Sequence, residues 1–395
     1  MNPLAHVRSA LTSGVSAGVN QGVSTLSRIA STAAVAVPVG VLVRAGWGLP
    51  TQLGASPGAI EPVAAGSPHF RDGRFVNTVP SSAASAGSGG SMLRDLLAHR
   101  GRGRPTLPVP VVVPHPRAAT TAAGELAATW YGHATAVLEV DGARVLVDPV
   151  FSERCSPSPL VGPSRLHPVP APVESLPAVD AVLISHDHYD HLDLPTVRAL
   201  LETQTAPFVV PLGVGAHLRG WGVPADRVVE LDWDGVHEVA GLELTCVEAR
   251  HFSGRGLVRD TTLWASWVVA GPRHRVFFGG DTGYHPAFHR IGAQHGPFEL
   301  TLLPVGAYGV QWPDIHMDPE EAVRAHGDLG GGVLLPIHWA TFDLAFHDWA
   351  EPPRRLLAAA AAAGVPVVVP RPGQRVDALA HDRTAPVTDW WSELV

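Results

Sequence analysis

Several residue types are scarce in this 395-residue sequence, and each shortage excludes a kind of chemistry. Lysine is absent, since all 28 basic residues are arginine, and this excludes catalysis through a lysine Schiff base. Two cysteines, Cys155 and Cys246, are too few for a disulfide framework, so nothing requires an oxidising compartment. The 36 acidic residues outnumber the basic ones, and the net charge of −8 argues against a nucleic-acid partner.

Long apolar runs are also missing. The stretch from Ile29 to Val43 contains Pro38 and falls short of the roughly 20 apolar residues that a membrane span needs. We therefore expect residues 1–66 to form a weakly ordered or amphipathic leader and the protein to be cytoplasmic. One alternative is that this segment associates peripherally with a membrane. Another is a signal peptide, although no clean small-x-small cleavage site follows Arg44.

The rest of the chain divides by composition. Residues 67–124 are predicted to form an N-terminal extension, in which Ser81 to Ser91 contains only Ser, Ala and Gly and is typical of a flexible linker. Residues 125–395 alternate strand-length apolar runs with helical segments, which predicts a layered α/β catalytic domain. The expected strands are 136–140, 145–147, 181–184, 208–210, 242–247, 263–269, 276–278, 300–304 and 333–337.

Three helices are predicted from their sequences. Residues 194–203 follow Asp193, and a second helix that begins at Pro319 follows Asp318; aspartate is a preferred N-cap because its carboxylate accepts from free backbone N–H groups. Residues 354–363 are rich in alanine and predict the third helix.

The densest group of metal-binding side chains is the stretch His186-Asp187-His188-Tyr189-Asp190-His191. It follows the run 181–184, so a buried strand delivers four such side chains onto one tight loop. The four are His186, His188, Asp190 and His191. Imidazole nitrogens and carboxylate oxygens bind zinc at roughly 2.0–2.2 Å, so one compact loop can serve two adjacent ions. Leaving these groups unpaired beside a buried strand would be costly.

Three further ligand candidates follow other predicted strands: His251, Asp281 and His338. Asp281 comes directly after Gly279-Gly280, which let the backbone approach the ions closely. Without analogy, His251 and His338 could equally be ordinary core or surface histidines.

Together the candidates divide into two sites. The first would hold His186, His188 and His251; the second would hold Asp190, His191 and His338; and Asp281 would bridge them. Each ion then keeps room for a shared water, as a catalytic rather than a structural site requires.

The H-x-H-x-D-H loop is the hallmark of the metallo-β-lactamase superfamily, and the chain resembles this superfamily over roughly 125–385. More narrowly, it resembles the branch of the N-acylphosphatidylethanolamine-hydrolysing phospholipases D. The stretches that carry the narrower resemblance are 131–135, 148–151, 156–157, 162–163, 181–193, 230–233, 264–267, 277–284, 306–308, 316–323, 337–339 and, more weakly, Phe70 to Asn77.

The resemblance implies a four-layer αββα sandwich with an N-terminal extension and two Zn²⁺ ions, with other divalent transition metals as alternatives. It places ligands at all seven positions above and a catalytic histidine at His316. Asp190 could also hold the nucleophile. Asp148 and His133 are predicted either to orient ligands or to make plain strand-end hydrogen bonds. The segment Glu248-Ala249-Arg250 departs from the animal enzymes, which puts the lipid substrate in question.

The resulting expectation is a phosphodiesterase that cleaves phospholipid-type substrates with a hydroxide held between the two ions. Its substrate would be a small molecule or a phospholipid, and a homodimer is compatible with this prediction. A lactonase similar to the ascorbate-6-phosphate lactonases has nearly the same site and is the main alternative. A nuclease similar to ribonuclease Z is disfavoured, because the net charge of −8 does not suit a nucleic-acid substrate. A non-catalytic binding protein on the same fold would have lost ligands, and none is missing here.

Overall fold

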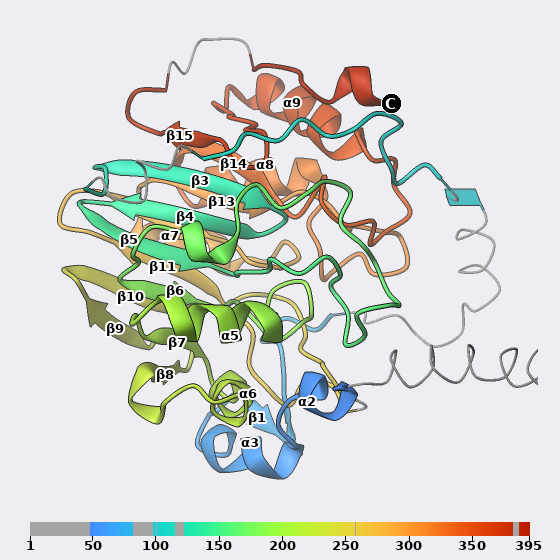
Figure 1. Cartoon of the computed structure of the whole chain (residues 1–395). Coiled ribbons are helices and arrows are strands. Elements are labelled where there is room, and N and C mark those ends of the chain that lie inside the picture. Colours follow the sequence, from blue (N-terminus) through green and yellow to red (C-terminus); the bar gives the residue numbers. More distant parts are fainter. Residues whose placement is uncertain (1–47, 82–97, 100, 115–121, 257, 382–386) are drawn as a thin grey trace, which may run out of the picture. The chain divides into compact units, whose positions relative to one another are not determined.

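The computed structural model describes residues 48–81, 98–99, 101–114, 122–256, 258–381 and 387–395 (Figure 1). Of the described residues, those from Pro50 onward, apart from 158–161, belong to one compact unit, which contains the elements of the site. The expected leader up to residue 47 and residues 82–91 of the expected linker lie outside the described residues. Among the described helices, none is both long and apolar enough to span a membrane.

Two mixed β-sheets form the centre of this unit. The first has the strand order β15-β3-β4-β5-β6-β7-β8, and the second has the order β14-β13-β12-β11-β10-β9. The first sheet consists of β3 (Leu126–Gly132), β4 (Thr135–Val140), β5 (Ala143–Val147), β6 (Ala181–Leu183), β7 (Phe208–Pro211), β8 (Val228–Leu231) and β15 (Arg375–Asp377). The second consists of β9 (Val236–Val239), β10 (Leu242–Val247), β11 (Ser266–Ala270), β12 (Arg275–Phe278), β13 (Phe298–Pro304) and β14 (Gly331–Ile337).

Strand direction decides which strand ends meet. In the second sheet β10, β11 and β12 pair antiparallel, whereas β12, β13 and β14 pair parallel. As a result β10, β12 and β14 run in one direction and end at the same edge. In the first sheet β5 to β8 run parallel.

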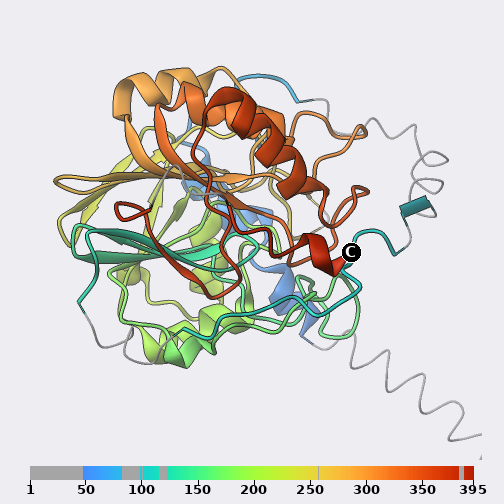
Figure 2. The same cartoon turned by 90° about the horizontal axis from the view of Figure 1, so that it is seen from above.

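Helices cover the outer faces of both sheets. On the first sheet lie α5 (Leu194–Thr203) and α6 (Val214–Gly220), and on the second lie α7 (Ala287–His295), α8 (Pro319–Asp328) and α9 (Glu351–Ala363) (Figure 2). Side chains alternate along the strands, as the pleat requires. Val182 and Ile184 pack with α5, whereas Ala181 and Leu183 join the core between the sheets. The architecture is the four-layer αββα sandwich that the sequence predicted.

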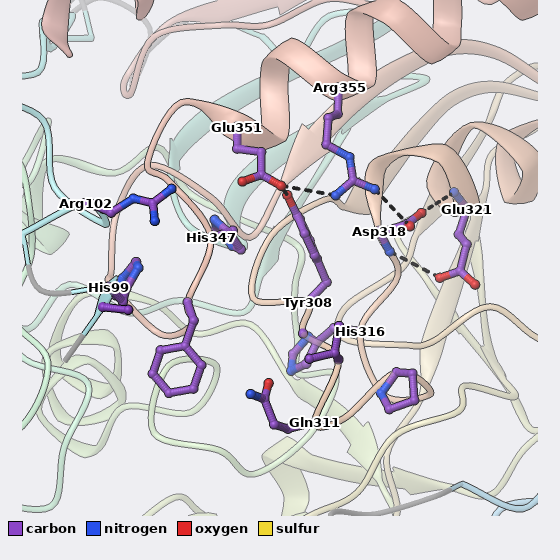
Figure 3. Close-up of a pocket in the computed structure, with 15 residues that line it drawn as sticks. His99, Arg102, Tyr308, Gln311, His316, Asp318, Glu321, His347, Glu351 and Arg355 are labelled. Carbon is purple, nitrogen blue, oxygen red and sulfur yellow. Dashed lines mark hydrogen bonds and ion pairs between the residues drawn. The ribbon is translucent and has the colours of Figure 1, made fainter. Parts of the chain in front are cut away.

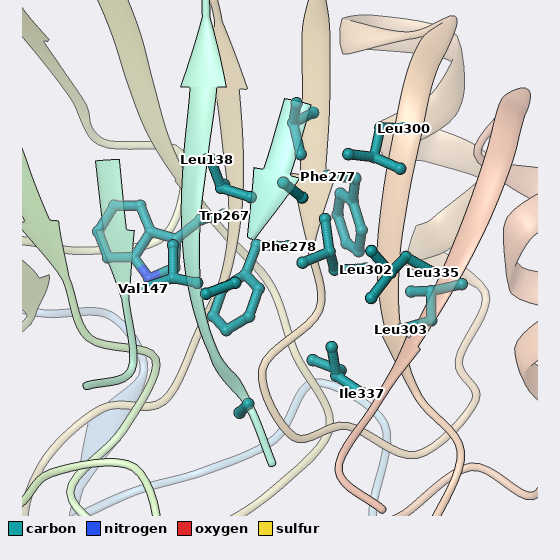
Figure 4. Close-up of a cluster of buried hydrophobic side chains, with 14 of the residues drawn as sticks. Leu138, Val147, Trp267, Phe277, Phe278, Leu300, Leu302, Leu303, Leu335 and Ile337 are labelled. Atoms are coloured by element: carbon teal, nitrogen blue, oxygen red, sulfur yellow. The ribbon is translucent and has the colours of Figure 1, made fainter. Parts of the chain in front are cut away.

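The core between the sheets is rich in large side chains (Figure 4). Trp267 and Phe278 are cross-strand partners, and the Trp267 indole N–H donates to the carbonyl of Ile184 in the other sheet at 3.0 Å. Phe277 points the opposite way and meets Phe288 of α7, with ring centroids 6.1 Å apart. Trp267 is therefore a core residue that joins the two sheets.

Most predicted elements are present. Asp193 caps α5 by accepting from Thr196 N, and Asp318 forms a capping box with Glu321 on α8. The expected strand at 263–269 is displaced, because β11 begins only at Ser266. Upstream of it, Leu263 N donates to Leu212 O and Ala265 N to Ser185 O, so this stretch joins the two halves of the fold instead of extending the strand. Strands β3, β8, β9 and β15 were not among the predicted strands; in β8 and β9 polar residues interrupt the apolar pattern.

The N-terminal residues contribute short elements. These are α2 (Leu49–Leu53), α3 (Pro57–Ala64), β1 (Phe70–Arg71) and β2 (Arg74–Phe75). The last part of the segment expected as a leader is thus helical, and α3 buries Ile60 and Ala64. Ile60 packs in the main core.

Candidate metal centre

The seven predicted ligands lie close together at one edge of the sandwich. The loop with His186 to His191 follows β6, Asp281 lies three residues after β12, and His338 directly follows β14. His251 comes four residues after the end of β10. Ligand sites at the carboxyl ends of strands are typical of α/β folds, because the loops there carry side chains on a rigid base.

Three groups of potential ligands form, of which the third, with Asp281, His316 and His338, shares members with the other two. The first two contain the residues predicted for the two sites, and His133 is added to the second. The first consists of His186, His188, His251 and Asp281, and the second of His133, Asp190, His191 and His338. Within each group the ligand atoms all lie within 4.8 Å of one another. His133, predicted as a neighbour of the ligands, contacts Asp190 directly, with its Nε2 2.9 Å from Oδ2.

Asp281 lies between the first and the second group. Its Oδ2 is 3.0 Å from His338 Nε2 and 3.2 Å from His191 Nε2. The same oxygen is 3.7 Å from His251 Nε2 and 3.9 Å from His186 Nε2. One carboxylate therefore faces nitrogens of both groups, which is the arrangement that a bridging ligand needs.

Several buried polar atoms of this cluster have no hydrogen-bond partner among the described residues. They are His191 Nε2, His338 Nε2, Asp281 Oδ1 and His316 Nδ1. His191 Nε2 is within ion-pair distance of Asp281 but outside hydrogen-bond geometry. Each such atom would cost about 1–3 kcal/mol if it stayed unsatisfied. A cation would satisfy them, and these nitrogen and oxygen donors suit zinc and other first-row divalent metals.

The electrostatics favour a cation at the same place. Burial lowers the pKa of His186 and His251 well below its ordinary value, so both imidazoles are neutral, the form that binds metals. Burial alone would lower the pKa of His338, but the nearby carboxylates of Asp281 and Asp190 outweigh this effect and raise the pKa to about 9. The carboxylates thus draw positive charge onto the second group, and a metal ion would replace the protons there.

Asp148 and Ser185 hold the ligands from behind. Asp148 Oδ2 accepts from His191 Nδ1 at 2.7 Å and from Ser185 Oγ at 2.6 Å. Ser185 Oγ also lies 2.9 Å from His186 Nδ1. Gly280 adopts a φ of +55°, and a Cβ there would lie 2.5 Å from the Cβ of Ser185. At Gly280 the missing side chain therefore permits a close approach to Ser185.

Two cavities meet at His316, whose side chain lines both. The smaller, of about 370 Å³, lies over the ligands and has Phe252, Trp312 and Leu344 in its wall. The larger, of about 660 Å³, is lined by charged, polar and aromatic side chains (Figure 3). His316 Nδ1 is 3.9 Å from Asp281 Oδ2, so the predicted catalytic histidine lies beside the ligand cluster.

A salt-bridge network forms one wall of the larger cavity. Arg355 contacts Asp318 at 3.0 Å and Glu351 at 3.2 Å, and the Tyr308 hydroxyl donates to Glu351 at 2.7 Å. Asp318 caps α8, Glu351 and Arg355 belong to α9, and Tyr308 lies in the loop after β13. Sequence reasoning did not assign Trp312 or Arg355 to the site, because their spacing from the ligands follows no motif; Tyr308 lies in a stretch that carried the resemblance.

Known proteins resemble the chain in sequence and in fold. A model of the beta-lactamase superfamily domain matches residues 143–339. An uncharacterized protein of Mycobacterium tuberculosis is 57% identical over 355 residues, which cover 89% of this chain and 94% of the relative. N-acyl-phosphatidylethanolamine-hydrolyzing phospholipase D 1 of Caenorhabditis elegans is 38% identical over 242 residues, or 58% of this chain and 68% of the relative. In fold, the metallo hydrolase Igni18 of Ignicoccus hospitalis has a TM-score of 0.50 at 23% identity, covering 64% of this chain and 97% of that one.

Proposed function

Because the protein belongs to the metallo-β-lactamase superfamily and is a metal-dependent hydrolase, we propose that it cleaves phospholipid-type phosphodiesters at a centre of two zinc ions. The observation that carries the proposal is Asp281, whose Oδ2 lies 3.0–3.9 Å from histidine nitrogens of both ligand groups. Two ions so placed would polarise a phosphate oxygen and lower the pKa of a water molecule to near neutrality.

The residues of the chain then have distinct roles. Asp190 is oriented by His133 and keeps a carboxylate oxygen 3.4 Å from His338 Nε2, so it can hold both an ion and the attacking water. His316 stands where the two cavities meet. From there it can donate a proton to the departing oxygen or hold the phosphate.

The two cavities support a diester with two unlike substituents. The aromatic wall of the smaller cavity suits an apolar group, and the polar wall of the larger suits a head group. The relative in Caenorhabditis elegans is named for hydrolysis of N-acyl-phosphatidylethanolamine, a substrate of this kind. A lactone has only one ester to place, so the second cavity favours the phosphodiesterase over the lactonase.

The test begins with metal analysis of the purified protein, followed by turnover of phospholipids, simple phosphodiesters and lactones. We expect two zinc ions per chain and cleavage of phospholipid vesicles. Asp281→Ala should lose most of the metal and the activity, whereas Asp226→Ala, at an exposed position outside the site, should behave as the wild type. Fewer than one zinc per chain, or full activity of Asp281→Ala, contradicts the two-ion centre. If the protein hydrolyses only lactones and no phosphodiester, the proposed phosphodiesterase activity is wrong.

A further inference from the structure

The N-terminal extension runs beside the segment that carries His251. Phe75 N donates to Asp260 O at 2.7 Å, and the Arg250 guanidinium donates to Pro80 O. Between these two anchors lies Asn77, at the end of the stretch Phe70 to Asn77 that carried part of the resemblance in sequence.

The Asn77 carboxamide forms hydrogen bonds with both the N–H and the carbonyl group of His251. Its Oδ1 accepts from His251 N at 3.1 Å, and its Nδ2 donates to His251 O at 2.8 Å. Oδ1 also accepts from the Trp264 indole N–H at 3.0 Å, and Nδ2 lies 3.3 Å from Ser81 Oγ. All four hydrogen-bonding positions of the carboxamide are therefore used. Two donors meet the oxygen and two acceptors meet the nitrogen, so the amide has one orientation only.

No regular element holds His251, because β10 already ends at Val247. Its ring is fixed by Ile315 O, which lies 2.8 Å from Nδ1, and Nε2 is thereby left for the first ligand group. Its backbone is fixed by Asn77 in the way that a neighbouring strand fixes a strand residue. The ring and the backbone of one ligand thus depend on two segments that are remote in sequence.

We propose that Asn77 is a positioning residue of the metal centre: it holds the backbone of His251 so that Nε2 meets the ion of the first group. The inference rests on the proposed function only in that His251 binds a metal ion. Docking of the extension and metal binding are then coupled. By linkage, an ion that needs His251 in place stabilises the docked extension by the same free energy with which Asn77 strengthens metal binding.

The test compares three variants of the full chain for zinc affinity by chelator competition. Asn77→Leu keeps the approximate volume and removes every hydrogen bond. Asn77→Asp keeps the oxygen that accepts from His251 N and from the Trp264 indole, but it cannot donate to His251 O. Thr78→Val is the matched control, since the Thr78 hydroxyl bonds to Glu248 in the same segment and touches no ligand.

We expect Asn77→Leu to lower the affinity for one of the two zinc ions about tenfold or more, which is the range found for residues that orient ligands. Asn77→Asp should lose less, and Thr78→Val should bind both ions as the wild type does. In the cobalt-loaded protein, the absorption bands of one ion should change in Asn77→Leu. A variant that was merely less stable would leave the bands of its folded fraction unchanged.

Wild-type affinity for both ions and an unchanged cobalt spectrum in Asn77→Leu would overturn the inference. If Asn77→Leu does not fold, wild-type affinity for both ions and an unchanged cobalt spectrum in Asn77→Asp would overturn the inference instead. The proposed function fails separately: a wild type that binds two ions but cleaves no phosphodiester removes that function, while weaker metal binding by the variants would still support the role of Asn77.

Discussion

Replacing Asp148 with asparagine tests whether the residues behind the ligands serve the metal ions. Asp148 is fully buried and accepts three hydrogen bonds, from His191 Nδ1 at 2.7 Å, Ser185 N at 2.6 Å and Ser185 Oγ at 2.6 Å. Asparagine offers one oxygen in place of two, and its NH₂ group would face a donor. At least one buried donor would lose its acceptor, at a cost of about 1–3 kcal/mol.

The effect on metal binding should exceed this loss of stability. Residues that orient a ligand typically change metal affinity by about 10- to 100-fold, which corresponds to about 1.4–2.7 kcal/mol. The zinc-loaded Asp148→Asn protein should therefore be destabilised by more than the metal-free one, because weaker binding also stabilises the folded state less.

The assay is thermal unfolding with and without saturating zinc, together with chelator competition. Asp343→Asn is the control, since Asp343 pairs with His99 at 3.0 Å outside the ligand groups. The refuting result is wild-type zinc affinity in Asp148→Asn together with equal destabilisation of both forms. Asp148 would then serve only as a strand-end hydrogen-bonding group.

Three further predictions concern other parts of the molecule. His316→Gln should lower kcat by roughly 10²–10⁴-fold with both metal ions retained; loss of one ion would instead make His316 a ligand. Phe277→Ala should destabilise the fold by about 3–5 kcal/mol in urea unfolding, because this buried ring packs against Phe288; a loss below about 1 kcal/mol would contradict that packing role. Burial lowers the pKa of His326 to about 4, so the unfolded chain, with a pKa near 6.5, takes up a proton first as pH falls. This should remove about 2 kcal/mol of stability between pH 7 and pH 5 in the wild type. Metal-free His326→Gln should lack this part of the pH dependence, and an identical pH profile in the two proteins would count against it.

The ligand loop could be predicted from the sequence because its information is local. His186 to His191 are adjacent residues after an apolar run, so neither the pairing of the sheets nor any distant contact was needed to find them. Asp281 could be found because it follows a buried strand, whereas His251 and His338 could be told from ordinary histidines only through the resemblance. The grouping of these residues could be predicted as well, and the structure brings the same residues together.

Asp148 and His133 were predicted as possible supporting residues, but Asn77 could not be predicted, because its role depends on a contact between distant segments. Asn77 bonds to the backbone of His251, which is 174 residues away in the sequence, and the residues adjacent to Asn77 do not predict this contact. Arg355 and Trp312 likewise reach the cavities only through the packing of α9 and of the loop after β13. The displaced start of β11 has the same cause, since backbone groups near Leu263 bond across to the other half of the fold.

The spread of the ligand set along the chain has a consequence for folding. The first group needs Asn77 near the N-terminus, whereas the second needs His338 near the C-terminus, so neither can form from a short stretch of chain. Contacts of such sequence separation form late, because closing long loops is entropically costly. A growing chain therefore cannot assemble the complete centre before residue 338 has been made. In refolding, uptake of metal by the complete centre should therefore mark the end of folding and not its beginning.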